Sequence, residues 1–225
     1  MQRLPIAKQG FVYIAVVAAL FLASALAGWT FVAIVSLLAT VLVVNFFRDP
    51  ERVDPADPNA VVAPADGKIV FTGKVFEDRF LRREALKISI FMNVLNVHVN
   101  RVPFSGEITE IHYEKGKFLA ANLDKASRDN EHNALVLRLT DGEEIAFVQI
   151  AGLIARRIDC WVQPGGRVER GQRFGMIRFG SRVDLYVPPG WQLAVTTGQQ
   201  VKAGESIVCY YGSARKNESP RRPES

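Results

Sequence analysis

The uncharged segment at residues 11–47 constrains this chain most, because an apolar stretch of that length is costly to leave in water. Two apolar runs, residues 11–27 and 31–47, are joined by Gly28-Trp29-Thr30. Each run has 17 residues, the short end of the roughly 17–25 residues that a helix needs to cross a bilayer. Gly28 interrupts the apolar pattern, and Trp29 suits a membrane interface. Residues 1–48 are therefore expected to form a membrane anchor of two apolar helices.

The charges beside the anchor indicate its orientation. Arg3 and Lys8 precede the apolar runs, and Arg48 and Arg52 follow them. Positive charge favours the cytoplasmic side, so a helical hairpin would keep both of its ends there. Two alternatives stay open. The sequence LASALA at residues 22–27 also fits a signal-peptide cleavage region, and one long tilted span fits the same apolar stretch.

The remainder of the chain has the composition of a soluble domain. The formal net charge is +5, but no basic cluster is interleaved with aromatic residues, so we expect no nucleic-acid partner. An anionic membrane surface explains the basic excess better. Prolines at positions 50, 55 and 58 exclude a helix from residues 49–60, which are expected to be a linker. Residues 213–225 have no apolar pattern and are expected to be a disordered tail.

Residues 61–212 are typical of a mainly β domain, because short alternating runs are separated by Gly and Pro turns. A weak internal repeat relates residues 162–171 to residues 195–204, each with a valine three residues before a glycine. This pattern favours a barrel-sandwich whose two halves resemble biotinyl/lipoyl-type (hammerhead) domains. The expected strands include residues 85–91, 96–101, 107–113, 134–139, 144–150, 159–162, 176–179 and 183–187.

The cysteines and histidines do not suggest a metal site. Cys160 and Cys209 are the only cysteines and are expected to be buried free thiols, with one disulfide as the open alternative. His98, His112 and His132 lack the close spacing of metal-binding histidines, so no metal is expected. His98 differs from the other two, because valines flank it and asparagines lie two positions away on the same side of a predicted strand. Its imidazole is either a satisfied structural group or a base.

Two further positions have an ordinary and a chemical interpretation. Asp66, in a Pro-x-Asp-Gly sequence, either caps backbone amides in a turn or orients a histidine. Ser181 follows Gly180 between two strand-like runs, so the pair is either a turn or the site of a nucleophile. The sequence around Ser181 is not a Gly-x-Ser-x-Gly elbow, which disfavours an α/β-hydrolase.

Taken together and in order, three blocks resemble the short form of the phosphatidylserine decarboxylase family. They are PADG at residues 64–67, FMNVLNVHVNRVP at residues 91–103 and FGS at residues 179–181, all behind an apolar anchor. The resemblance extends from about Asp49 to about Gly212 and includes EKGKFLAANLDKASRDNEHN at residues 114–133. The NVHVNRVP block and the order of the three blocks are specific, whereas Gly-Ser or Asp-Gly alone is not.

The resemblance implies a proenzyme that cuts itself between Gly180 and Ser181, giving chains 1–180 and 181–225. Ser181 is then the nucleophile of maturation and the source of a covalent pyruvoyl group, which forms a Schiff base with the substrate amine. His98 is the implied general base and acid, and Asp66 orients it. The implied reaction converts membrane phosphatidylserine to phosphatidylethanolamine and CO₂ in phospholipid biosynthesis. It needs no separate cofactor and no metal.

The sequence departs from the family pattern at two places. Phe179-Gly180-Ser181-Arg182 stands where longer members often carry Leu-Gly-Ser-Thr, and Arg101 stands where they tend to carry a second histidine. His98 is therefore expected to act in both maturation and turnover. The implied location is the inner (cytoplasmic) membrane, with the catalytic domain on the cytoplasmic side.

Three questions stay open at this point. The chain is either a monomer or a homo-oligomer. One competing function is that of a membrane-bound zinc peptidase, which would require clustered ligands. The other is that of a non-enzymatic, membrane-anchored barrel-sandwich module, which would stay one uncut chain.

Overall fold

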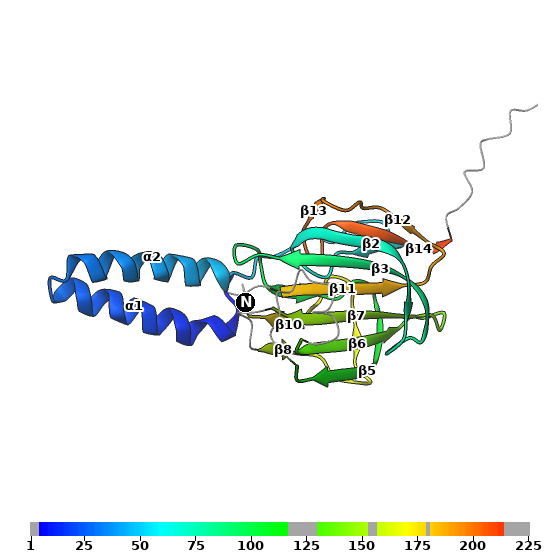
Figure 1. Ribbon diagram of the computed structural model, residues 1–225, viewed down its shortest axis with the longest axis horizontal. Coiled ribbons are helices and arrows are strands. Elements are labelled where there is room, and N and C mark those ends of the chain that lie inside the picture. Colours follow the sequence, from blue (N-terminus) through cyan, green and yellow to red (C-terminus); the bar gives the residue numbers. More distant parts are fainter. Residues whose placement is uncertain (1–4, 117–129, 153–156, 179–180, 214–225) are drawn as a thin grey trace, which may run out of the picture.

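A pair of antiparallel helices projects from one end of a β-rich body in the computed structural model (Figure 1). The structure describes residues 5–116, 130–152, 157–178 and 181–213. A 3-10 turn, η1 (Lys8–Gly10), leads into α1 (Phe11–Leu26), and α2 (Thr30–Phe46) returns to the body. Gly28, between the helices, has φ +74°, a left-handed conformation that glycine adopts without strain. The two predicted apolar runs thus form a hairpin and not one long span.

The helices expose apolar side chains instead of burying them. Leu26 is 89% exposed and Phe31 is 80% exposed. The segment Lys8–Leu26 is long and apolar enough to cross a membrane, whereas Thr30–Phe46 is apolar but shorter. An exposed apolar surface of this extent needs a non-aqueous environment or a partner.

Backbone hydrogen bonds join the segment before α1 to the segment after α2. The Ala7 amide donates to the Phe47 carbonyl (2.8 Å), and the Asp49 amide donates to the Pro5 carbonyl (2.7 Å). The Tyr13 and Phe47 rings stack with centroids 5.4 Å apart. The chain therefore enters and leaves the hairpin at one place on the body.

The main sheet has eight strands in the order β13-β2-β3-β11-β7-β6-β5-β9, with every neighbouring pair antiparallel. β11 lies between β3 and β7 in this sheet, as Figure 1 shows. The strands are β2 (Gly67–Glu77), β3 (Arg83–Met92), β5 (Gly106–Glu114), β6 (His132–Arg138), β7 (Glu144–Ala151), β9 (Arg167–Val168), β11 (Ser181–Val187) and β13 (Gln200–Val201).

Two three-stranded sheets complete the body. One has the order β1-β14-β12 and the other β4-β10-β8. Their strands are β1 (Ala60–Val62), β4 (Val99–Arg101), β8 (Ile158–Cys160), β10 (Arg173–Ile177), β12 (Trp191–Leu193) and β14 (Ile207–Ser213). The expected mainly β fold class is confirmed, and the likeness to biotinyl/lipoyl-type halves stays a prediction.

The internal repeat has a structural counterpart. Gly165 and Gly171 in the first copy have φ +79° and +75°, and Gly198 and Gly204 in the second have φ +98° and +75°. The two copies contain β9 and β13, which are the two opposite edges of the eight-stranded sheet. The repeated glycines are thus needed for turns that lead into and out of the edge strands.

Alternation along β11 decides which side chains reach the main core. Val183, Leu185 and Val187 belong to the largest apolar cluster, whereas Tyr186 packs in a different cluster. Successive side chains of a strand point to opposite faces, so Ser181 lies on the core face with Val183. The sheet therefore presents Ser181 inward, toward the smaller sheets.

The residues after the hairpin run extended and are tied to the body by ion pairs. Asp49 accepts from Arg173 Nε at 2.7 Å, and Asp54 accepts from Arg170 Nη2 at 2.7 Å. No helix occurs in residues 49–59 of the described chain, as the prolines require. The division into anchor, linker and catalytic domain stays a prediction. Of the tail expected at residues 213–225, Ser213 ends β14, and residues 214–225 lie outside the described residues.

Some local expectations were wrong. A tight turn at Gly180-Ser181, one of the two alternatives, would pair the strands beside it, but β10 pairs with β4 and β8 while β11 pairs with β3 and β7. His98 precedes β4 instead of lying within a strand. Cys209 is a buried free thiol as expected, but Cys160 is exposed.

Candidate active site

Ser181 is the first residue of β11 and is fully buried. It pairs with Met92 at the end of β3 and with Ala151 at the end of β7. Its hydroxyl Oγ donates to the Met92 sulfur at 3.2 Å. A thioether is a weak acceptor, so this contact leaves the hydroxyl available for a stronger base. Gly180 lies outside the described residues.

His98 is the buried base candidate. The imidazole is 0% exposed, and its Nδ1 lies 2.9 Å from the Asn96 carbonyl oxygen. A carbonyl only accepts, so Nδ1 carries the proton and Nε2 presents a lone pair. Nε2 has no hydrogen-bond partner within the described part of the chain. A buried acceptor without a hydrogen-bond partner costs free energy. This nitrogen is therefore suited to accept a proton during a reaction.

Burial keeps the imidazole of His98 neutral. Desolvation lowers the pKa of His98 to about 4, the Asn96 hydrogen bond opposes this shift, and the charge of Arg48 adds to it. The Phe46 ring, at the end of α2, contributes to the burial with its centroid 4.2 Å from that of the imidazole. At neutral pH His98 can therefore accept a proton but does not already hold one at Nε2.

Asp66 has other partners than His98. Its carboxylate accepts from Arg52 Nη2 at 2.8 and 3.1 Å and from the Ala203 amide at 2.8 Å. Arg52 also reaches Glu205 at 3.4 Å. These contacts fix the turn after β1 against the linker. The described residues contain no hydrogen bond between Asp66 and His98, so the orienting role of Asp66 stays a prediction.

Arg101 also binds the linker. Its Nη1 donates to the Gly171 carbonyl at 2.8 Å, and its Nη2 donates to the Pro50 carbonyl at 2.9 Å. The residue is 6% exposed. These bonds give the arginine at the position of the second family histidine a structural role, and its guanidinium cannot act as a base at neutral pH.

A chain of buried amides leads to the serine and was not recognised in the sequence. Asn133 Nδ2 donates to Gln149 Oε1 at 3.0 Å, and Gln149 Nε2 donates to Asn100 Oδ1 at 2.9 Å. Asn100 Nδ2 lies 3.7 Å from the same Met92 sulfur that Ser181 contacts. Each amide is at most 1% exposed. The order of donors and acceptors directs the Asn100 amide group toward the serine end of the chain.

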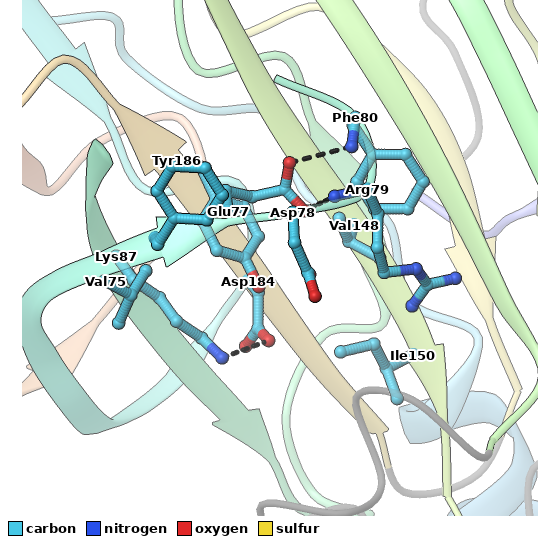
Figure 2. Close-up of a pocket in the computed structure, with 11 residues that line it drawn as sticks. Val75, Glu77, Asp78, Arg79, Phe80, Lys87, Val148, Ile150, Asp184 and Tyr186 are labelled. Carbon is cyan, nitrogen blue, oxygen red and sulfur yellow. Dashed lines mark hydrogen bonds and ion pairs between the residues drawn. The ribbon is translucent and has the colours of Figure 1, made fainter. Parts of the chain in front are cut away.

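A separate cavity lies on the other side of the main sheet. Figure 2 shows Lys87 and Asp184 joined across it, with their charged atoms 3.0 Å apart, near Glu77 at the end of β2. The Glu77 carboxylate accepts the Phe80 and Leu81 amides, both at 2.7 Å. Asp184 is three residues from Ser181, so their side chains project from opposite faces of β11. This cavity is therefore not the serine site.

The other histidines have structural surroundings. His112 lies 2.6 Å from Glu110, and His132 Nδ1 lies 2.8 Å from the Asn130 carbonyl. Among the described residues, no group of three His, Cys, Asp or Glu side chains could hold a metal ion. His112 lies on β5, and His132 begins β6, two strands from the serine strand β11, whereas the His98 carbonyl contacts the end of β10, the strand that leads to Ser181.

His98 and Ser181 are linked through two shared elements. The His98 carbonyl accepts the Ile177 amide at 3.4 Å, at the end of the strand that leads to Ser181. Asn100, two residues after His98, contacts the Met92 sulfur. Within the described residues no hydrogen bond joins His98 Nε2 to the Ser181 hydroxyl, so the structure links the two residues only through these neighbouring groups. A buried serine hydroxyl and a buried neutral imidazole on neighbouring elements are the groups that activation of a weak nucleophile requires.

Comparison with known proteins gives the family. Residues 39–209 match the model of the phosphatidylserine decarboxylase family. Phosphatidylserine decarboxylase proenzymes of Desulfotalea psychrophila and Nitrosomonas eutropha are similar to this chain, with 48% identity over 206 residues and 52% identity over 209 residues. Each alignment covers 92% of this chain, and they cover 96% and 95% of the respective relatives. The chain belongs to the phosphatidylserine decarboxylase family.

Proposed function

We propose that this chain is a self-cleaving proenzyme that becomes a pyruvoyl-dependent decarboxylase of phosphatidylserine and forms phosphatidylethanolamine. The observation that carries the proposal is the placement of Ser181. Its hydroxyl is buried at the first residue of a central strand, immediately after the chain has crossed from one sheet to another. A turn serine would lie at the surface, whereas a nucleophile that must avoid water is placed inside.

Maturation follows from the atoms of Gly180 and Ser181. Ser181 Oγ attacks the Gly180 carbonyl carbon, the peptide C–N bond breaks, and the nitrogen takes a proton to become a free amine. Loss of the serine α-proton then expels the Gly180 carboxylate from the serine Cβ and leaves dehydroalanine. Water replaces the nitrogen, which departs as ammonia. The sequence consumes one water, releases one ammonia and leaves a pyruvoyl group on chain 181–225.

His98 is the residue we propose to move protons in these steps. Its neutral Nε2 takes the proton of the Ser181 hydroxyl, and the Nδ1 bond to Asn96 holds the ring in the required tautomer. The same nitrogen then serves as a proton donor at the substrate α-carbon. We propose Asp66 as a positioning residue for His98 during maturation, supported by its place in the family block and by its burial.

The surroundings of Ser181 fit the proposed pyruvoyl group. Met92 and Ala151 flank the position with fully buried apolar side chains, which exclude water from a reactive carbonyl. The Asn100 amide, held by Gln149, supplies a hydrogen-bond donor on the same side. When formed, the group supplies an electron sink for the charge left at the α-carbon as CO₂ departs.

The hairpin provides the proposed route to a lipid substrate. Residues 1–48 anchor the enzyme in the inner membrane, residues 49–60 link it, and residues 61–212 form the catalytic domain on the cytoplasmic side. Lys8 and Arg48 support this orientation, because both ends of the hairpin carry positive charge. The Phe46 contact with His98 supports it further, because the anchor then ends at the proposed base.

Substitution of the serine tests the proposal. Ser181→Ala removes the nucleophile, so the purified variant should remain one uncut chain and form no phosphatidylethanolamine. Ser89→Ala is the matched control, because Ser89 is also a buried serine in the main sheet, on the neighbouring strand β3. The control should cut itself and decarboxylate phosphatidylserine. An active, uncut Ser181→Ala protein contradicts the proposal.

A further inference from the structure

The turn between β3 and β4 presents two aliphatic side chains to the outside. Val94 is 41% exposed and Leu95 is 60% exposed. The asparagines on either side satisfy the backbone of the turn. Asn93 Oδ1 accepts the Leu95 amide and Asn96 Oδ1 accepts the Asn93 amide, both at 2.9 Å. The turn is therefore locally fixed, and its outermost surface is apolar.

This Val94–Leu95 tip lies beside the base of the hairpin. Arg48 Nη2 donates to the Leu95 carbonyl at 2.7 Å, and Arg48 Nη1 donates to the Asn45 carbonyl at the end of α2 at 2.6 Å. One side chain thus bridges the tip and the apolar helix. Figure 1 shows β3 running toward the end of the body from which α1 and α2 project.

Cationic side chains surround the same end of the body. Lys8 is exposed at the start of the hairpin. Arg178 donates to the Tyr13 hydroxyl on α1 at 3.0 Å, and the Arg178 amide donates to the Arg157 carbonyl at 3.2 Å. Asp159 pairs with Arg178 at 2.8 Å and with Arg157 at 3.8 Å, and this carboxylate offsets part of their charge, although the Arg157 side chain is 71% exposed. We call Lys8, Arg48, Arg157 and Arg178 the basic collar.

We propose that the Val94–Leu95 tip is a second membrane-contacting element, which inserts into the boundary between headgroups and acyl chains while the basic collar lies among anionic headgroups. Single exposed aliphatic residues are common on protein surfaces and need no explanation. Here, however, the exposed pair is bonded through Arg48 to the end of the apolar helix α2, an arrangement that fits an interfacial membrane contact.

Insertion of the tip would fix the height of the proposed active site above the bilayer. His98 follows the tip by three residues, and its ring already contacts the end of α2. A tip fixed at the headgroup boundary would hold the imidazole at the level of the serine carboxylate of a lipid. The inference rests on the proposed function for its lipid setting, but its test does not depend on catalysis.

The test places a fluorophore at the tip. Leu95→Cys is made with Cys160→Ser, because Cys160 is the exposed cysteine, whereas Cys209 is buried and burial raises the pKa of its thiol. An environment-sensitive label on the introduced thiol is measured in vesicles of phosphatidylcholine and phosphatidylglycerol. Phe76→Cys in the same background is the matched control, since Phe76 is 66% exposed but pairs with Glu84 at the opposite end of β3.

We expect lipid-borne nitroxide near the headgroup to quench the label at position 95 at least several-fold more than the label at position 76. Iodide in the water should quench them in the reverse order. Equal access of iodide to both labels overturns the inference. A label at position 95 that is shielded from iodide, unquenched by nitroxide lipid and dependent on protein concentration also overturns it, because a second copy then covers the tip. Both quenching measurements can be repeated on the Ser181→Ala variant. Failure of the proposed chemistry can therefore be distinguished from failure of the proposed membrane contact.

Discussion

The Phe46 ring lies against the His98 imidazole, with 4.2 Å between ring centroids and 36° between ring planes. Phe46 is the last residue of α2, and His98 belongs to the β body, so the anchor contributes directly to the environment of the proposed base. Val97, Val99 and Met176 complete the apolar cluster around this contact. The end of α2 therefore helps to keep water away from the imidazole, whatever else the hairpin does.

Removing this ring should change the pH dependence of self-cleavage. His98 must be neutral to accept a proton, and with a pKa of about 4 it is neutral at all pH values well above 4. Phe46→Ala admits water, which moves the pKa upward toward the ordinary histidine value of 6.5. The acidic limb of the rate profile should therefore shift to higher pH by roughly 1 unit or more. The rate is measured from fragment masses after a pH jump.

Phe46→Leu is the control for that experiment. Leucine keeps an apolar group over the imidazole, so its acidic limb should stay close to that of the unmodified protein. An identical acidic limb in Phe46→Ala would mean that the ring does not set the protonation of His98.

The lowered pKa of His98 in the unmodified protein also predicts that its stability depends on pH. The pKa of His98 is near 6.5 in the unfolded chain and about 4 in the folded one, so the unfolded state binds the proton first as pH falls. This contribution to stability is complete above pH 6.5 and is lost progressively down to pH 4, at about 1.4 kcal/mol per pH unit. His98→Gln should flatten the curve of unfolding free energy against pH in this window. Parallel curves for the two proteins would contradict the buried neutral imidazole.

Substitutions in the Arg52–Asp66 pair can distinguish a structural role of Asp66 from a role in positioning His98. Both side chains are about nine-tenths buried and lie 2.8 Å apart. Breaking such a pair from either side leaves a buried charge, so Asp66→Asn and Arg52→Gln should each destabilise the protein by about 3 kcal/mol. If Asp66 positions His98 as proposed, Asp66→Asn should in addition slow self-cleavage roughly tenfold more than Arg52→Gln does. Equal cleavage rates at equal melting temperatures would reduce Asp66 to a structural ion-pair partner.

Substitution of Gln149, the central residue of the amide chain near Ser181, should lower stability and slow self-cleavage. Gln149→Leu leaves Asn100 Oδ1 and Asn133 Nδ2 without their partners, at a cost of about 1–3 kcal/mol for each buried atom. The freed Asn100 amide should also slow self-cleavage, which is followed by fragment mass. Gln192→Leu is the control, because Gln192 is exposed on β12 and should tolerate leucine. Normal stability and normal self-cleavage in Gln149→Leu would show that the hydrogen-bonded amides contribute to neither property.

Local patterns predicted much of this fold. The strands that became β3, β5, β6, β7 and β11 alternate or are bounded by Gly and Pro turns, and these signals depend only on neighbouring residues. The apolar helices were predictable for the same reason. Ser181, His98 and Asp66 stood out because three blocks occur in one order, not because any single block is distinctive.

Features that depend on distant pairing were not predictable. Gly180-Ser181 had the pattern of a hairpin turn, but β10 and β11 select partners in different sheets. The amide chain joins the consecutive strands β6 and β7 to β4, and Gln149 and Asn100 are 49 residues apart in sequence, so no local spacing reveals it. Gly175 shows the same limit, since an added Cβ would lie 2.9 Å from Gln149 Nε2 and closer still to the Asp159 carbonyl oxygen. Its need for glycine is a property of the packed structure.

The intact mass of the purified protein tests the central claim most directly. The account predicts two chains, of 180 and 45 residues, cut between Gly180 and Ser181. The smaller chain should be lighter than its unmodified sequence by one ammonia, because a carbonyl oxygen replaces the serine amine while the serine hydroxyl oxygen leaves on the carboxylate of the larger chain. A single intact chain of full mass from a preparation that decarboxylates phosphatidylserine would contradict the account.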